Sequence, residues 1–419
     1  MKKNPATASL YVHVPFCSGK KCDYCDFYSL PLDPEADFRP ELFIETLLSE
    51  GERLFEEYRP VLIPTVYIGG GTPSVLGAAG ICTLLRGLSE LISRYSCAPQ
   101  EITIEANPES ADEAFLVAAR DGGATRLSLG VQTFHAPSRW AVNRIGDESL
   151  LPERLALAAA YFPGAFSVDL ISGFPRQDEK VLLDDIKRSL AFSPAHVSLY
   201  ALGIEAGTPL ARREKCYIPK QDEIDRLWLS GRNALEKAGY KQYEVSNFCL
   251  PGKESRHNIR YWRMLSWLAI GPSASGTIID DETGTGYRYT FREYYHAEAC
   301  HPAMPDSLRR KGAEERREEE RREEDERGED ERGEEFLDSF TLMKETLLMG
   351  FRYIEGPDDD LFRKRFHRNI EECIPKTINT WRGRGLLQSD KNALTKEGLL
   401  FLNRFLIDAF EELDSKFIP

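Results

Sequence analysis

Three cysteines lie within nine residues near the start of the chain, in the stretch FCSGKKCDYC: Cys17, Cys22 and Cys25. Three thiolates can hold three irons of a [4Fe–4S] cube and leave the fourth iron without a protein ligand, whereas a closed zinc site needs a fourth ligand. His13 is near in sequence, but it lies on a predicted strand before the loop, and there is no second CxxC pair. The spacing therefore favours an iron–sulfur cluster and leaves zinc as the alternative.

The segments that must position these cysteines alternate in a regular way. Short β-branched runs are separated by amphipathic stretches, and this alternation is typical of βαβ units in a parallel sheet. The six runs are SLYVHV, TVYIGG, EITIEA, TRLSLGV, AFSVDLI and HVSLYAL. Right-handed crossovers between them predict an α/β fold with a partial (β/α)6 barrel.

Polar residues gather where these runs end. They are the GGGTP stretch, Glu105, Gln132, Asp169 and Tyr200. In barrels of this type the chemistry takes place at the carboxyl ends of the strands. The pattern predicts one barrel mouth lined by many strands.

Composition excludes several classes of protein. The chain has 419 residues and a net charge of −14, which argues against nucleic-acid binding because that needs a basic surface. No run of 18 or more apolar residues is present, so we expect no membrane span. Nine cysteines, six of them scattered singly, do not form a disulfide framework and favour the reducing cytoplasm.

A composition shift divides the chain. We expect a barrel with an extension over residues 1–295, a charged solvated linker over 296–335, and a small, mainly helical, winged-helix-like domain over 336–419. The linker has almost no apolar residues from Ser307 to Glu335, so it cannot build a core. After Phe336 apolar periodicity returns, with a turn or short hairpin near Ser389 to Ala393.

Together these motifs resemble the radical S-adenosylmethionine (SAM) superfamily, in its coproporphyrinogen-dehydrogenase-like branch. The resemblance starts with LYVHVPFC, CDYCDF and YIGGGTPS and covers roughly residues 8 to 276. The later motifs, in order, are IEANPE, RLSLGVQTF, NRIG, VDLISGFPRQ, HVSLYALGIEAGTPL, YEVSNF and RHNIRYW.

The resemblance implies that Cys17, Cys22 and Cys25 hold a [4Fe–4S] cluster whose open iron binds SAM. An electron from a donor protein would then cleave the sulfonium to give a 5′-deoxyadenosyl radical. The residues implied to bind SAM are Tyr11 and Phe27 beside the cluster and adenine, Gly70, Gly71 and Thr72 at the amino group, and Glu105, Gln132, Arg144 and Asp169 at the ribose and carboxylate.

Two features depart from the family pattern. The cysteine spacing is C-x4-C-x2-C, one residue longer than the family's C-x3-C-x2-C, and Gly19 makes the loop permissive enough to absorb it. Ser275 stands in GPSASG where relatives often carry a histidine.

Within the branch, two stretches indicate the HemW group of heme chaperones. Dehydrogenases carry a fourth cysteine two residues after the third, but this chain has Phe27 in that place. The HemW group carries HNxxYW, which is present here with His257, Tyr261 and Trp262. An imidazole can ligate heme iron and aromatic faces suit a porphyrin. The alternative is a buried turn in which Trp262 fills the core.

The resemblance therefore implies a cytoplasmic heme chaperone rather than an enzyme. It would bind heme and transfer it to acceptor proteins, with a SAM-bound cluster, and homodimerisation stays open. The first alternative is an oxygen-independent coproporphyrinogen III dehydrogenase, a radical SAM oxidative decarboxylase. The second is a SAM- or cluster-binding protein without a porphyrin ligand.

Overall fold

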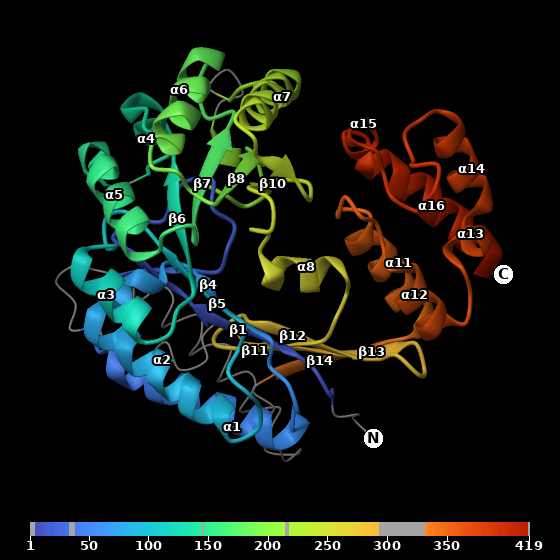
Figure 1. Ribbon diagram of the computed structural model, residues 1–419, viewed down its shortest axis with the longest axis horizontal. Coiled ribbons are helices and arrows are strands. Elements are labelled where there is room, and N and C mark those ends of the chain that lie inside the picture. Colours follow the sequence, from blue (N-terminus) through green and yellow to red (C-terminus); the bar gives the residue numbers. More distant parts are fainter. Residues whose placement is uncertain (1–4, 33–37, 145, 214–217, 293–331, 418–419) are drawn as a thin grey trace.

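The computed structural model describes residues 5–32, 38–144, 146–213, 218–292 and 332–417 (Figure 1). A continuous sheet of 12 strands runs through the molecule. Its centre consists of the six predicted runs, all parallel and in chain order. These strands are β1 (Ser9–Val14), β4 (Thr65–Gly70), β5 (Glu101–Ala106), β6 (Arg126–Gln132), β7 (Phe166–Ser172) and β8 (His196–Ala201). The predicted α/β fold is confirmed.

Helices cover the outer face of these strands (Figure 1). They are α1 (Pro40–Tyr58), α2 (Gly77–Ser93), α3 (Glu113–Asp121), α4 (Ala136–Ala141), α5 (Leu151–Tyr161), α6 (Glu179–Leu190) and α7 (Gln221–Lys237). Single 3-10 turns, η1 (Pro73–Leu76), η2 (Glu148–Leu150) and η3 (Leu210–Arg212), lie in the connections. Asp112 and Asp178 cap α3 and α6 by accepting from Phe115 N and Val181 N, a contact worth about 1 kcal/mol.

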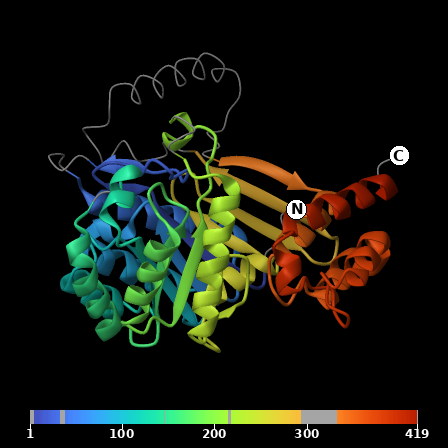
Figure 2. The same ribbon diagram turned by 90° about the horizontal axis from the view of Figure 1, so that it is seen from above.

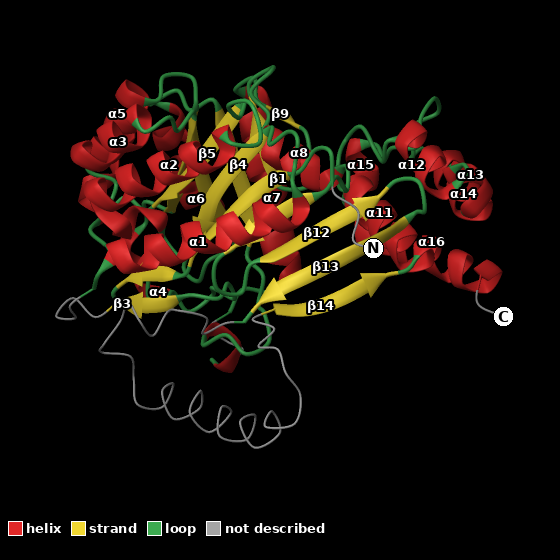
Figure 3. Ribbon diagram, turned by 90° about the horizontal axis from the view of Figure 1, so that it is seen from below, coloured by secondary structure: helices red, strands yellow, loops and turns green. Residues whose placement is uncertain are grey.

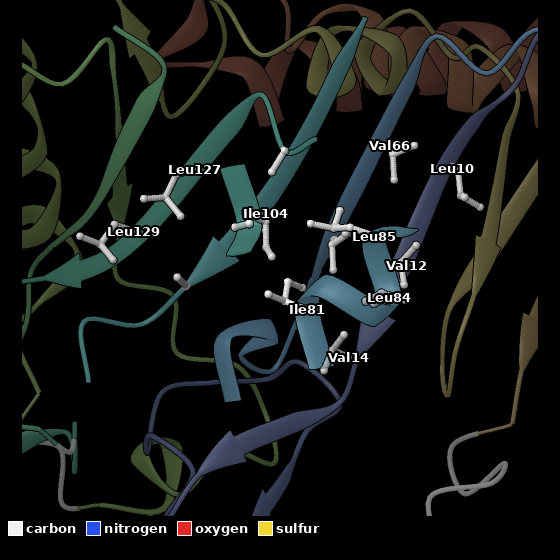
Figure 4. Packing of buried hydrophobic residues seen from close by; sticks show 14 of the residues in the cluster. Leu10, Val12, Val14, Val66, Ile81, Leu84, Leu85, Ile104, Leu127 and Leu129 are labelled. Carbon is white, nitrogen blue, oxygen red and sulfur yellow. The ribbon is translucent and has the colours of Figure 1, made fainter. Parts of the chain in front are cut away.

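Alternate side chains of each strand point away from the barrel interior, into the hydrophobic core between the sheet and the helices. Figure 4 shows Leu10, Val12 and Val14 of β1 on the same face as Ile81 and Leu84 of α2. Because side chains alternate along a strand, Ser9, Tyr11 and His13 face the barrel interior. The face of β1 that lines the barrel interior is therefore polar.

One helix, Pro73–Ser93, is long and apolar enough by length and composition to cross a membrane. Its residues Ile81, Leu84, Leu85 and Leu88 are buried in the core between sheet and helices. Packing within the barrel accounts for this apolar face.

The sheet extends beyond the barrel on both sides, which the sequence analysis did not predict. β11 (Trp267–Ile270) pairs in parallel with β1 and continues into the antiparallel strands β12 (Ser275–Asp280), β13 (Thr285–Phe291) and β14 (Arg332–Leu337) (Figure 3). Beyond β8 lie β10 (Asn247–Cys249) and β9 (Lys241–Gln242). β2 (Phe16–Ser18) and β3 (Leu30–Leu32) form a separate pair.

The end of the predicted linker is therefore wrong. Residues 332–335 belong to β14, whose backbone pairs with β13. The charged side chains are satisfied at this edge: Arg332 lies 2.9 Å from a carboxylate oxygen of Glu57, and Arg288 lies 3.5 Å from one of Glu335. The rest of the charged segment is outside the described residues.

The C-terminal region is helical, as predicted, and its helices form a second hydrophobic core to which Met264 and Ile279 also contribute. The helices are α11 (Ser339–Gly350), α12 (Asp359–Phe366), α13 (Ile370–Cys373), α14 (Pro375–Gly383), α15 (Lys396–Leu399) and α16 (Leu402–Phe417). Phe351, Trp381 and Phe405 are fully buried at its centre. A bridge between Leu387 and Leu394 encloses the predicted turn. Figure 2 shows this domain to one side of the barrel, beyond the extended strands.

Candidate functional site

The polar strand ends meet in one cavity of about 390 Å³. It lies at the carboxyl ends of the parallel strands, where barrel chemistry takes place. Of the predicted cluster and SAM residues, all but Tyr11 line it: Cys17, Cys22, Cys25, Phe27, Gly70, Gly71, Thr72, Glu105, Gln132, Arg144 and Asp169. Residues from six different segments of the chain are thus brought together.

The cysteine loop is braced against the barrel. Its tip is a turn in which Cys25 N donates to Cys22 O over 3.2 Å, and Gly19 has a φ of 71° that suits glycine. Asp23 N donates to Val142 O over 2.9 Å, and the Asp23 carboxylate pairs with Arg213. The longer C-x4-C spacing is therefore accommodated by a left-handed glycine in an anchored loop.

The thiols lie in a poorly solvated place. Burial raises the pKa of the Cys25 thiol to about 11 and also raises the pKa of Cys17. The three sulfurs are close enough to influence one another's charge. Because metal ligands must be deprotonated, metal binding here would release protons.

Within the described ranges, no three His, Cys, Asp or Glu side chains are grouped to hold one metal ion. In a [4Fe–4S] cube each thiolate binds its own iron, so its three sulfurs lie farther apart than the ligands of a single ion. Cys17, Cys22 and Cys25 all line the cavity, and the choice between a cluster and zinc rests on their spacing in the sequence.

The glycine-rich loop after β4 is pressed against the cysteine loop. A Cβ on Gly71 would lie 2.5 Å from the carbonyl oxygen of Phe16, next to Cys17. Gly70 has a φ of 118°, and its Cβ would lie 2.8 Å from the His13 ring. Gly71 N also donates to Val14 O over 2.8 Å. Glycine is required because any side chain would occupy the space between the two loops.

Two carboxylates line the cavity wall. Glu105 accepts hydrogen bonds from the Tyr67 hydroxyl over 2.6 Å and from Gly70 N over 3.2 Å. Burial raises the pKa of Glu105 to about 7. Asp169 accepts from Ser128 Oγ over 3.0 Å, and burial raises its pKa as well. The carboxylate oxygens of both residues can accept hydrogen bonds from hydroxyl donors such as those of ribose.

A row of hydrogen bonds links the ends of β4, β5 and β6 along the cavity. Arg144 Nη2 donates to Asn107 Oδ1 over 2.9 Å and to Gly130 O over 2.7 Å, and Asn107 Nδ2 donates to Thr72 Oγ1 over 2.8 Å. The guanidinium also reaches toward the cluster loop, with Nη1 3.7 Å from Cys22 Sγ. Arg144 therefore lies between the cysteines and the strand ends.

Gln132 is held in a strained conformation. It has a φ of 67° and lies at a bulge where β6 and β7 shift register. Its buried Oε1 has no hydrogen-bond partner among the described residues. Such strain and an unsatisfied acceptor are typical of a ligand site. Together with the glycine cradle, this open acceptor indicates that the cavity fits a ligand that brings hydrogen-bond donors, as SAM does.

Among the side chains that hold the predicted site residues by hydrogen bonds, Tyr67, Asn107 and Ser128 were not predicted. Each had a signal in the sequence. Tyr67 is two residues before the glycines, Asn107 follows the end of β5, and Ser128 shares a strand face with Gly130 and Gln132. Tyr200, predicted at the end of β8, does line the cavity.

Tyr11 is the one predicted cluster or SAM residue that does not line the cavity, and its place beside the cluster stays a prediction. Its ring lies deeper in the barrel, where its hydroxyl bonds His13 Nδ1 over 2.8 Å. β1 pairs with β4 so that Tyr11 is level with Tyr67 and His13 is level with Gly69. Tyr11 is therefore one layer below the cavity. Phe27, by contrast, stands at the rim and is 65% exposed.

The HNxxYW residues lie at the other end of the barrel. They form α8 (Arg256–Trp262), which sits between the barrel and the C-terminal helices (Figure 1). His257 Nδ1 lies 2.9 Å from Thr65 Oγ1, and its N donates to Glu101 Oε1 over 2.9 Å. Thr65 and Glu101 are the first residues of β4 and β5. The helix thus closes the amino ends of the strands.

Within this helix His257 is buried, whereas Tyr261 and Trp262 are half-buried. His257 is 1% exposed, and burial lowers its pKa to about 3. Tyr261 meets the His257 ring edge-on at 4.9 Å, and Trp262 packs near Tyr353 and Ile354 of the C-terminal domain. His257 is thus buried, as the alternative interpretation expects, whereas Trp262 is only half-buried. A heme contact of this motif stays a prediction.

Comparisons with known proteins give the chain its family. The Radical SAM superfamily model matches residues 11–188. Heme chaperone HemW of Escherichia coli K12 is 33% identical over 270 residues, which cover 64% of this chain and 70% of that protein. Heme chaperone HemW of Lactococcus lactis is 29% identical over 410 residues, which cover 96% of this chain and 97% of that protein.

A solved structure shows the same fold. Coproporphyrinogen III oxidase (HemN) from Escherichia coli, a radical SAM enzyme, superposes with a TM-score of 0.73 over 97% of this chain and 91% of that one, at 19% identity. Among further relatives, heme chaperone HemW of Buchnera aphidicola from Schizaphis graminum is 34% identical and is covered over 70% of its length. This chain therefore belongs to the HemW family of the radical SAM superfamily.

Proposed function

We propose that this protein is a heme chaperone that binds heme and transfers it to acceptor proteins. The observation that carries the proposal is the cavity that brings Cys17, Cys22 and Cys25 to the glycine cradle, in a chain at least 33% identical to several proteins named heme chaperone HemW. Heme, its acceptor proteins and an electron donor would be the partners, and the cytoplasm the compartment.

The three cysteines would hold a [4Fe–4S] cluster, and the cavity would hold SAM. Gly70, Gly71 and Thr72 would lie along the amino group of SAM. Glu105 and Asp169 would accept from the ribose hydroxyls, and Arg144, with its fork of donors, suits the carboxylate. Gln132 offers a free acceptor, and Phe27 shields one side of the entrance. When bound, cluster and SAM would supply one-electron chemistry.

Heme contact by His257, Tyr261 and Trp262 would require α8 to move away from the barrel, because the imidazole is buried and hydrogen-bonded to Thr65. We therefore propose that the motif acts first by closing the barrel. A direct role in heme binding is tested against a second buried histidine, His196, which bonds Ser167 and Tyr243 outside the motif.

The experiment is anaerobic reconstitution with iron and sulfide, followed by heme titration in the Soret region. It compares wild type, Cys17→Ala, His257→Ala and the control His196→Ala. A cluster that is lost in Cys17→Ala and heme binding by the wild type would support the proposal. About tenfold weaker heme binding in His257→Ala than in His196→Ala, together with changed Soret and visible bands of the heme that remains bound, would assign the motif to heme. Equal losses would assign it to barrel closure, and a wild type that binds no heme would refute the chaperone function.

The main rival is coproporphyrinogen III decarboxylation. The fold shared with HemN fits it, but the CDF stretch places exposed Phe27 where that reaction's enzymes carry a fourth cysteine. Anaerobic turnover of coproporphyrinogen by the reconstituted protein would overturn the chaperone proposal. A protein that holds the cluster and SAM without either heme binding or turnover would fit the second alternative.

A further inference from the structure

Glu105 is held by the side chain of Tyr67, for which the sequence analysis gave no role. The Tyr67 hydroxyl donates to Glu105 Oε1 over 2.6 Å, while Gly70 N donates to Oε2 over 3.2 Å. Each carboxylate oxygen thus has one fixed donor and keeps a lone pair for a ligand. A carboxylate held at both oxygens cannot rotate freely.

Space for this contact comes from a missing side chain. A Cβ on Gly69 would lie 2.9 Å from Glu105 Oε2 and 2.9 Å from Tyr67 Cε1. β4 and β5 pair with Ile68 level with Ile104, so Glu105 is level with Gly69 and Tyr67 lies one layer below. The glycine lets Glu105 lean over β4 and accept from the Tyr67 hydroxyl, which reaches it from the layer below.

Tyr67 is itself fixed from below. Its ring centroid lies 5.1 Å from that of His257 and 6.3 Å from that of Tyr11. These rings lie in the closed lower half of the barrel, between the cavity and α8. The hydroxyl therefore has little freedom to leave Glu105.

We propose that Tyr67 is a positioning residue that fixes the Glu105 carboxylate in the orientation that accepts the ribose hydroxyls of a nucleoside ligand. The inference rests on the proposed binding of SAM in this cavity. It adds a residue that acts through Glu105 and does not itself touch the ligand.

The charges around Glu105 give the proposal a pH signature. The groups that face it are Tyr67 on β4, Asp169 on β7, Tyr11 on β1 and Tyr200 on β8. Burial raises the pKa of Glu105 to about 7, and the hydrogen bond from Tyr67 opposes that rise. Loss of the hydroxyl would raise the pKa further, so less of the carboxylate would be ionised at neutral pH.

The test is SAM binding by equilibrium dialysis to the anaerobically reconstituted protein, from pH 6 to pH 9, in wild type and Tyr67→Phe. If the pKa rises by about one unit, the ionised fraction at pH 7 falls about fivefold, whereas at pH 9 it falls by only about a tenth. We expect the weakening of SAM binding in Tyr67→Phe to be about fivefold greater at pH 7 than at pH 9, where only the lost orientation of the carboxylate acts. Tyr240→Phe is the matched control, because it removes a buried hydroxyl bonded to Pro194 O.

Three outcomes separate the ideas. Equal weakening of SAM binding at every pH, or no change, would overturn the positioning role and leave the proposed function intact. A wild type that binds no SAM would overturn both. A Glu105→Gln background supplies the second check, because Tyr67→Phe should then produce no pH-dependent change if it acts through Glu105.

Discussion

The contact between Gly71 and the base of the cysteine loop predicts a strong effect of one methyl group. In Gly71→Ala, the new Cβ would lie 2.5 Å from Phe16 O, 2.8 Å from Phe16 C and 2.9 Å from Pro15 C. All three are backbone atoms, so a side-chain rotation cannot relieve the contact. The two loops must separate by about 0.9 Å to reach an ordinary carbon–oxygen contact of about 3.4 Å.

The cost of this separation can be estimated. Overpacking of a tight interior by added methyl groups costs about 1–3 kcal/mol. The hydrogen bond from Gly71 N to Val14 O, 2.8 Å long, crosses the same gap and weakens with it. We expect the free energy of unfolding to fall by about 2 kcal/mol. Cys17 follows Phe16 directly, so we also expect iron and sulfide content after reconstitution to fall by at least about half, because a site needs its ligands within about 0.5 Å.

Urea unfolding of the cluster-free protein measures the first effect, and iron and sulfide analysis measures the second. Gly383→Ala is the control, because its Cβ would meet no atom within 4 Å on α14. That change should be neutral or stabilise the protein by up to about 1 kcal/mol. If Gly71→Ala unfolds within about 0.5 kcal/mol of wild type and takes up a full cluster, the close apposition of the two loops is refuted.

Two further predictions concern the opposite end of the barrel. Arg365 is 1% exposed and joins α12 to the barrel extension through Asp281 and the carbonyl oxygen of Met264. Arg365→Met should therefore lower the free energy of urea unfolding by about 3 kcal/mol. The control Arg363→Met, at an exposed arginine of the same helix, should change it by less than about 0.5 kcal/mol. Equal losses of stability in the two variants would contradict the role of buried Arg365 in joining α12 to the barrel extension. Because burial lowers the pKa of His257 to about 3, the unfolded state alone takes up this proton below pH 6.5, so the stability of wild type relative to His257→Gln should fall by about 2 kcal/mol between pH 8 and pH 5. A pH-independent difference between the two proteins would show that His257 is not buried in its neutral form.

The barrel could be predicted because its sequence signals are local. The strands are short β-branched runs with an apolar outer face, and the helices between them have one apolar face. β11 to β14 escaped prediction for the opposite reason. β14 reads RGEEFL, a charged stretch whose strand conformation depends on pairing with β13 and on partners such as Glu57. Contacts of that kind form only in the folded chain.

The strand ends and the motif positions were enough to predict which residues of the site lie close together. They correctly bring Glu105, Gln132 and Asp169 into one cavity, because the carboxyl ends of parallel strands share an edge. They do not give depth along a strand, so they could not show that Tyr11 is level with Tyr67 and outside the lining of the cavity. They also do not tell which end of the barrel a later helix covers, and this is what separates His257 from the cysteines.

The position of His257 changes how a loss of heme binding must be interpreted. Its imidazole supports Thr65 at the start of β4, and its ring contacts Tyr67, which holds Glu105. Loss of the imidazole can therefore disturb both the barrel floor and the cavity without any contact to heme. Weaker heme binding in His257→Ala thus fits a ligand and a structural support equally well. An imidazole ligand would also change the Soret and visible bands of the heme that remains bound, whereas a structural support would leave those bands unchanged. The spectrum of the bound heme, rather than its affinity, distinguishes the two roles.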